Sequence, residues 1–187
     1  HGMKIVKKWI RNSERNIKYC LKLDVRKYFD SISQDVLIDK LHKKIHDERF
    51  RDLLIKIIRT AEHDLSLGFY TSQWFANFYL QDFDHSVKED LRIKHYIRYM
   101  DDMVLFHSNK RELHRIKKLI ELYLRDNLSL EIKDNWQLFR FHTRKDKGRF
   151  LDFMGFRFYR NRVTLRRKIA LKAMRKARRI AKKKHTT

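Results

Sequence analysis

The sequence predicts an α+β fold in which an antiparallel sheet carries helices on one face. Short apolar segments of strand length lie close together in the chain, so most of them can pair as hairpins. Longer segments between them repeat apolar residues at helical spacing. Strands and helices mixed in this way are typical of α+β domains.

Helical spacing of apolar residues predicts the helices. They cover residues 3–11, 35–45, 49–62, 71–91, 109–124 and 167–184. Ser33 is expected to cap the second, Thr71 and Ser72 the fourth, and Asn109 begins the fifth. The last is basic with one narrow apolar stripe, which favours a helix with one docked side and phosphate-facing sides.

Short runs rich in β-branched and aromatic residues predict the strands. These runs cover residues 19–25, 95–100, 103–108, 128–133, 136–142, 150–158 and 162–165.

The charge of the chain is strongly one-sided. Its 187 residues contain 46 Lys and Arg against 23 Asp and Glu, a net charge of +23. A polyanion is therefore the first expected partner and an anionic membrane surface the second. Aromatic residues make up 13% of the chain, which favours nucleic acid because bases stack on aromatic rings.

The apolar runs and the cysteine content narrow the class of protein. No apolar run approaches the roughly 20 residues that a membrane span needs, and no signal peptide follows His1. Cys20 is the single cysteine, which excludes a disulfide within the chain and a multi-cysteine zinc site. We expect a soluble protein of the reducing cytoplasm.

Two adjacent aspartates, Asp101 and Asp102, lie between the apolar runs of HYIRYMDDMVLF (95–106). The flanking runs should pair as a hairpin, and Asp is an ordinary turn residue, so the turn alone would explain them. Asp24 changes this interpretation, because it ends the apolar strand YCLKLDV, where an unpaired charge is costly.

If that strand lies beside the hairpin, Asp24 and Asp101 meet at one edge of the sheet. Clustered carboxylates suit hard cations such as Mg²⁺. Two such ions about 3.5–4 Å apart can clamp both oxygens of a phosphoryl transfer.

Four ordered motifs resemble the palm of a reverse transcriptase. They are YCLKLDVRKYFDSI, LGFYTSQWFANFYLQDFD, RYMDDMVLF and FLDFMGFRF, and the resemblance spans about residues 17–180. It is closest to bacterial enzymes of the group II intron, diversity-generating and phage-defence types. It implies a palm with an RRM/ferredoxin-like antiparallel core, partial fingers and the start of a thumb.

The resemblance also implies site residues. Asp24, Asp101 and Asp102 would be catalytic and, with the carbonyl of Val25, would bind two Mg²⁺ ions, for which Mn²⁺ is a possible substitute. The nucleotide would be contacted by Phe29, Gln73, Asn77 and Lys133. The primer and template would be contacted by Tyr99, Met100, Phe153, Met154, Gly155, Arg166, Arg167 and Lys168.

Ordinary structural roles stand beside several of these assignments. Phe29 would exclude a ribose 2′-OH, although core packing also explains it. Gln73 and Asn77 share a helix face and would look toward the template–nucleotide pair, or they would cap and anchor the helix. Lys133 would lie near the departing pyrophosphate, or it is a solvated charge.

The sequence also departs from intron-type relatives. Ser66-Leu67-Gly68 stands where they have Pro-Gln-Gly, so the nucleotide-contacting glutamine is replaced by Leu67 and we expect lower fidelity. Only 23 residues precede Asp24, so we expect a palm-centred piece: residues 1–165 form the palm with residual fingers, and residues 166–187 form a basic helix that starts the thumb.

The leading functional hypothesis is an RNA-directed DNA polymerase, cytoplasmic and encoded by a bacterium or phage. It would use an RNA template, a DNA primer and dNTPs, with a structured retroelement RNA as a possible partner. Two alternatives remain open. They are protein-primed or untemplated DNA synthesis of the phage-defence type, and a catalytically incompetent palm fragment that binds RNA.

Overall fold

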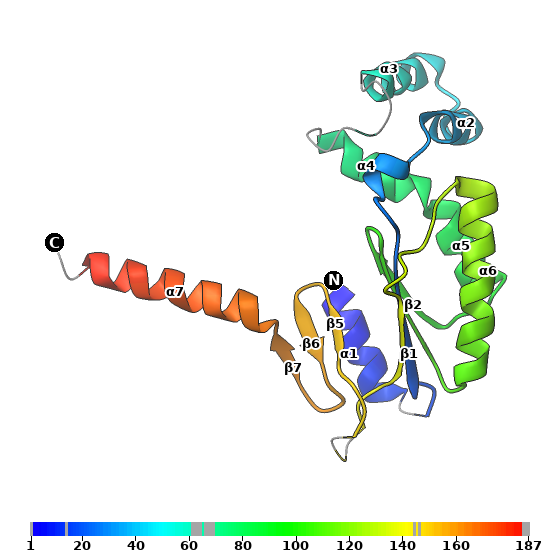
Figure 1. Cartoon of the computed structure of the whole chain (residues 1–187). Helices are drawn as coiled ribbons and strands as arrows, with labels where there is room; N and C mark the ends of the chain where they lie inside the picture. Colours follow the sequence, from blue (N-terminus) through cyan, green and yellow to red (C-terminus); the bar gives the residue numbers. More distant parts are fainter. Residues whose placement is uncertain are drawn as a thin grey trace.

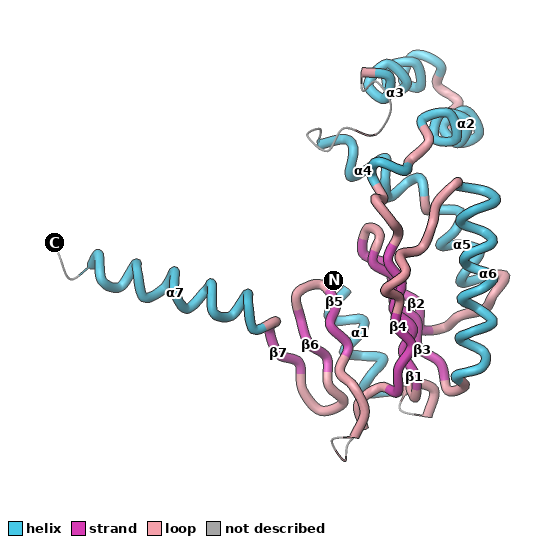
Figure 2. Tube along the Cα trace, in the orientation of Figure 1, coloured by secondary structure: helices cyan, strands magenta, loops and turns pink. Residues whose placement is uncertain are grey.

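The main sheet of the computed structural model has four antiparallel strands. The structure describes residues 2–13, 15–60, 65, 70–143, 145 and 147–184, and the side chains up to residue 181. The sheet consists of β1 (Tyr19–Asp24), β2 (His95–Tyr99), β3 (Asp102–His107) and β4 (Gln137–Arg140), in the order β2-β3-β1-β4. Figure 2 shows these strands in magenta at the centre of the molecule. The α+β class is confirmed.

One face of this sheet carries the larger hydrophobic core. Side chains alternate along a strand, and Leu21 and Leu23 of β1 point into this core. Helices α5 (Gln81–Glu89) and α6 (Lys110–Leu128) supply the opposing residues and cover this face (Figure 1). Leu113, Ile116 and Ile120 are fully buried there.

The opposite face carries a second core, which the predicted single helical layer did not include. Cys20, Val104 and Phe106 point into it. Helix α1 (Gly2–Asn12) covers it with Val6 and Ile10. A second antiparallel sheet, β5 (Leu151–Phe153), β6 (Phe156–Phe158) and β7 (Val163–Leu165), completes the cover.

A group of helices extends beyond the Asp24 end of β1. After the short 3-10 turn Phe29–Ser31 the chain forms α2 (Gln34–Lys44), α3 (Glu48–Arg59) and α4 (Tyr70–Tyr79) (Figure 1). The predicted cap is confirmed, because Ser33 Oγ accepts a hydrogen bond from the Val36 amide at 3.4 Å. The segment Ser66-Leu67-Gly68 lies outside the described residues.

Three predicted elements differ from the structure. The predicted strand over 150–158 is the β5–β6 hairpin, which turns at Met154 and Gly155. The long helix over 71–91 is two helices, because Leu80 leaves helical geometry (φ −92°, ψ 5°) between α4 and α5. Thr71 and Ser72 lie inside α4, which begins at Tyr70, so neither is its cap. The predicted strand at 128–133 is also wrong: α6 continues to Leu128, and only a single bridge, between Val25 and Ile132, forms in that segment.

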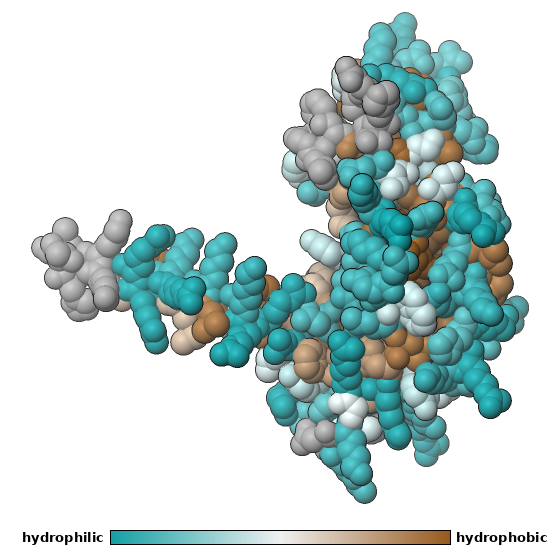
Figure 3. Space-filling view, viewed as in Figure 1, coloured by the Kyte–Doolittle hydropathy of each residue, from teal (hydrophilic) through white to brown (hydrophobic). Residues whose placement is uncertain are grey.

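Helix α7 (Arg167–Lys184) projects away from the body (Figure 1). The predicted docking of its apolar stripe is wrong, because Ile169, Ala173, Ala177 and Ile180 are all exposed. Figure 3 shows the helix as a mostly hydrophilic arm with a few apolar groups. Within the described part of the chain, no helix combines the length and the apolar character that a membrane crossing requires.

Candidate active site

The paired aspartates lie at the tip of the β2–β3 hairpin. Tyr99 pairs with Asp102, so Met100 and Asp101 form a two-residue loop. Met100 has a left-handed backbone (φ 57°), which is typical of the first position of a tight hairpin turn. Asp102 is already the first residue of β3.

Asp24 lies directly beside this tip. It is the last residue of β1 and the cross-strand partner of Asp102. Cross-strand partners have Cβ atoms about 4.5–5.5 Å apart and point to the same face. The structure thus brings Asp24, Asp101 and Asp102 together at one end of the sheet.

Two lysines hold the carboxylates. Lys133 Nζ lies 2.6 Å from Asp24 Oδ1, and the Lys133 amide donates to the Asp24 carbonyl at 2.8 Å. Lys22 Nζ lies 3.0 Å from Asp102 Oδ2 and donates to the Asp152 carbonyl of β5 at 2.9 Å. Lys22 therefore connects the candidate site to the second sheet.

The pKa values show how crowded the negative charges are. Burial raises the pKa of Asp101, and the neighbouring Asp24 carboxylate raises it further. Burial raises the pKa of Asp102 to about 6, against the opposing effect of the Lys22 ammonium group. The Asp24 carboxylate raises the pKa of Lys133 by accepting its hydrogen bond. The site thus favours added positive charge.

The donors at this end of the sheet fit magnesium in kind. They are carboxylate oxygens, the ligands that hard divalent cations prefer. Asp102 Oδ1 is buried and finds no hydrogen-bond partner among the described residues, as expected of an oxygen suited to a cation. Over the same residues no group of three His, Cys, Asp or Glu side chains is arranged to hold a metal ion. Lys22 and Lys133 are paired with Asp102 and Asp24.

Hydrogen bonds of Arg98 connect the hairpin tip to α5. Arg98 donates to both carboxylate oxygens of Asp84 on α5, at 2.9 and 2.5 Å. It also donates to the Met100 carbonyl at 2.8 Å. The Tyr96 hydroxyl donates to the same Asp84 carboxylate at 2.6 Å. Since one guanidinium joins α5 to the turn, the position of Asp101 depends on Arg98.

The predicted nucleotide-contacting residues differ in how they are placed relative to the hairpin tip. Asn77 is exposed on α4, accepts from Arg98 Nη1 at 3.2 Å and lies 3.4 Å from Met100 Sδ. Gln73 is exposed one turn earlier, and its carbonyl accepts from Asn77. Phe29 is half-buried with its ring centroid 5.7 Å from that of Tyr28, so the packing that explains Phe29 is present. Tyr99 is 56% exposed.

The predicted primer-contacting residues lie in the β5–β6 hairpin and at the start of α7. Phe153 is fully buried in the second core, whereas Met154 and Gly155 form the turn with φ of 51° and 81°. Arg166 donates to Asp152 Oδ1 at 2.5 Å and through its amide to the Gly155 carbonyl at 2.8 Å. Arg167 and Lys168 open α7 and are exposed.

The sequence interpretation missed Lys22, Asp84 and Arg98. A signal was available, because Lys22 and Arg98 are charges inside strands whose neighbours are apolar, and such a charge needs a partner. The partner was not readable from the chain, since Asp84 is one of several acids on an amphipathic helix.

Comparison with known proteins agrees with this geometry. Residues 2–156 match the family described as Reverse transcriptase (RNA-dependent DNA polymerase). No curated protein sequence matches the chain.

Several solved structures share the fold. Apo telomerase from Candida tropicalis superposes with a TM-score of 0.64 at 13% identity, covering 87% of this chain and 35% of that chain. The same telomerase truncated from its C-terminal domain gives 0.65 at 14%, covering 87% and 38%. Telomerase from Candida albicans in complex with a fragment of telomeric RNA gives 0.57 at 14%, covering 84% and 34%.

The present chain thus spans little more than a third of the length of those telomerase chains. The family match covers most of the chain, including both strands that carry the aspartates, and we conclude that this protein belongs to the reverse transcriptase family.

Proposed function

We propose that this chain contains the catalytic centre of an RNA-directed DNA polymerase, which adds dNTPs to a primer 3′-OH on an RNA template. The observation that carries the proposal is the approach of Asp24 and Asp101 at the end of β1. Burial, followed by the charge of Asp24, raises the pKa of Asp101. Because burial and mutual repulsion disfavour the two negative charges, a bound cation would stabilise the ionised carboxylates.

The proposed metal ligands are Asp24, Asp101, Asp102 and the carbonyl of Val25, and the cofactor is a pair of Mg²⁺ ions, with Mn²⁺ as a substitute. When bound, such ions supply charge stabilisation at the attacking and leaving oxygens of nucleotidyl transfer. Lys133 already forms an ion pair with Asp24, and we assign its ammonium group to the departing pyrophosphate.

The residues around the tip are assigned to the substrates. Asn77 and Gln73 present polar groups beside Met100, which suits contact with the template–nucleotide pair. Phe29 is assigned to exclusion of the ribose 2′-OH. Tyr99 and Met100 are assigned to the primer terminus, where the exposure of Tyr99 leaves its ring available.

The remaining primer contacts are assigned to the second sheet. Met154 and Gly155 form a turn next to α7, and Phe153 anchors that turn in the core. Arg166, Arg167 and Lys168 would contact the backbone of the primer–template duplex. We assign residues 1–165 to a palm with residual fingers and 166–187 to the start of a thumb, which the projection of α7 supports (Figure 1).

Nucleic-acid partners are supported by the net charge of +23. They are also supported by the telomerase of similar fold that is in complex with telomeric RNA. The motifs favour a bacterial or phage-encoded enzyme of the group II intron, diversity-generating or phage-defence type, acting in the cytoplasm.

Primer extension tests the proposal. A DNA primer on an RNA template is incubated with dNTPs or rNTPs, with and without Mg²⁺, using wild type, Asp101→Asn and Asp52→Asn. Asp52 is exposed on α3 and serves as the matched control. Wild type and the control should extend with dNTPs only when Mg²⁺ is present, and Asp101→Asn should be inactive while it melts as wild type does.

The alternatives give different outcomes in the same assay. Extension by Asp101→Asn would refute the assignment of the catalytic centre. Products made without a template would favour untemplated synthesis. No extension by wild type, with RNA affinity unchanged by Asp101→Asn, would favour the RNA-binding fragment.

A further inference from the structure

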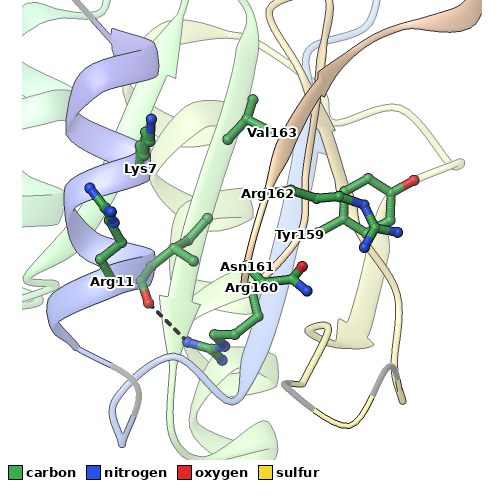
Figure 4. A pocket seen from close by; sticks show the side chains of 8 residues that line it. Lys7, Arg11, Tyr159, Arg160, Asn161, Arg162 and Val163 are labelled. Carbon is green, nitrogen blue, oxygen red and sulfur yellow. Dashed lines mark hydrogen bonds between the residues drawn. The ribbon is translucent and has the colours of Figure 1, made fainter.

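A basic site lies at the opposite end of the main sheet from the aspartates. A cavity of about 470 Å³ separates the C-terminal half of α1 from the turn between β6 and β7. Figure 4 shows Lys7 and Arg11 on α1 at one side of it, and Asn161 and Arg162 on the turn at the other side, with the Arg162 side chain directed away from α1 over Tyr159. None of the residues that line it is acidic.

The frame of this cavity is fixed by Arg160. Its guanidinium donates to the carbonyls of Ile17 at 2.6 Å, His142 at 3.2 Å and Ile10 at 3.3 Å, and the residue is only 9% exposed. The dashed line in Figure 4 marks its bond to α1. The Tyr159 amide donates to the Arg162 carbonyl at 2.9 Å and closes the turn. The two walls are therefore joined and preorganised.

The charges of the three other cations at the cavity are not neutralised by any described residue. Lys7, Arg11 and Arg162 are all exposed, and none makes an ion pair with any residue in the described ranges. The Arg162 guanidinium lies over the Tyr159 ring, 4.4 Å from its centroid, which orients it without neutralising it. Because no acidic side chain lines the cavity, these cations leave its rim positively charged, and a positive rim attracts anions.

The cavity is separate from the candidate active site. Arg160 bonds to Ile17, just before β1 begins at Tyr19, whereas Asp24 ends that strand. The strand between them, Tyr19–Asp24, by itself spans about 17 Å. One nucleotide bound at the aspartates therefore does not occupy both places.

We propose that Lys7, Arg11 and Arg162 bind the phosphodiester backbone of a nucleic-acid strand outside the active site. Three cations on two separate elements suit several phosphates of a polymer better than a single anion. Asn161 adds a hydrogen-bonding amide beside them. A flat lipid surface fits less well, since the site is concave and its apolar members Ile10 and Val163 are not exposed.

The test compares two triple variants of equal charge. Lys7→Ala/Arg11→Ala/Arg162→Ala removes the site, and Lys110→Ala/Arg111→Ala/Lys118→Ala removes three exposed cations from α6, on the other face of the sheet. Both are made in an Asp101→Asn background and measured in EDTA, so that the result does not depend on polymerase activity. Fluorescence anisotropy follows binding of single-stranded RNA and of single-stranded DNA across a salt series.

The site variant should bind more weakly, and its salt slope should fall by about 0.7 for each phosphate that is no longer neutralised, hence by about 2. The α6 variant should be weakened clearly less. The RNA and DNA arms identify which strand is held, and a selective decrease in either supports the proposal. Equal decreases in the two triple variants would overturn it, because the effect would then be that of net charge alone.

Two further measurements separate loss of the site from misfolding and from binding of a different anion. Lys7→Ala/Arg11→Ala leaves the Arg162–Tyr159 contact intact and should show about two thirds of the slope change, with an unaltered melting temperature. Inorganic phosphate and phosphatidylserine vesicles are added as separate probes. Loss of binding to either of these with oligonucleotide affinity unchanged would refute a nucleic-acid strand as the ligand.

Discussion

Arg98 should be the residue on which the shape of the aspartate hairpin depends most. Its side chain is 8% exposed and its partner Asp84 is 28% exposed. Burial works against the charged guanidinium, but the hydrogen bonds and charge of Asp84 outweigh it and raise the pKa of Arg98. Arg98→Met removes one partner of this pair and, among the described residues, leaves the Asp84 carboxylate with the Tyr96 hydroxyl alone.

Loss of one partner of a buried ion pair costs about 3–5 kcal/mol, and the partial exposure of Asp84 puts this pair at about 3 kcal/mol. For a chain of this size that is roughly 6–12 °C in melting temperature. The Met100 carbonyl loses its donor as well, so primer extension should fall more than the stability loss explains when both are measured well below the melting temperature.

Thermal unfolding monitored by circular dichroism measures the change in melting temperature, and Arg111→Met, at an exposed position of α6, is the control. Adding Asp84→Leu to Arg98→Met should recover part of the loss, because the uncompensated buried charge is then gone. If the second substitution instead adds its own full loss, the charge-pair reasoning is refuted.

Three other perturbations follow from the structure. Gly155→Ala should lower the free energy of unfolding by about 1–2 kcal/mol, because φ is 81° there and an L side chain is strained in that conformation. The new Cβ would also lie 2.8 Å from Ile169 Cδ1. If Gly155→Ala/Ile169→Ala melts as wild type does, the steric contact and not the backbone strain is the cause of the loss. Burial acts to raise the pKa of Asp82, but the hydrogen bond and charge of Lys40 outweigh it and lower that pKa. This stabilisation is present above pH of about 4 and lost on acidification. The melting-temperature gap between wild type and Lys40→Met should therefore narrow from pH 7 to pH 3, unlike that of Lys56→Met, whose exposed lysine makes no ion pair with a described residue. Burial raises the pKa of the Cys20 thiol, so a thiol reagent at pH 8 should leave the folded chain unmodified and label one equivalent after denaturation; labelling without unfolding would contradict the burial.

Strand alternation and a short turn made the β2–β3 hairpin predictable, whereas the approach of Asp24 was expected only on the condition that its strand lies beside that hairpin, which the structure fulfils. The second sheet was harder, since β5, β6 and β7 each have three residues and carry little periodicity. The break at Leu80 was missed because Leu80 and Phe83, both buried, continue the apolar pattern across it. Lys133 was named as a candidate near the pyrophosphate but not as the partner of Asp24, and Lys22 was missed, because a long flexible side chain leaves no sequence trace of where its ammonium group goes.

Strands β1 and β3 are shared between the two hydrophobic cores. Leu21 and Leu105 pack on one side, and Cys20 and Phe106, their immediate neighbours in sequence, pack on the other. Neither core can therefore come apart while the other keeps its sheet in register. Since Asp24 and Asp102 belong to these same two strands, heat should separate them only when both cores unfold, and thermal inactivation of the wild type should coincide with the global melt.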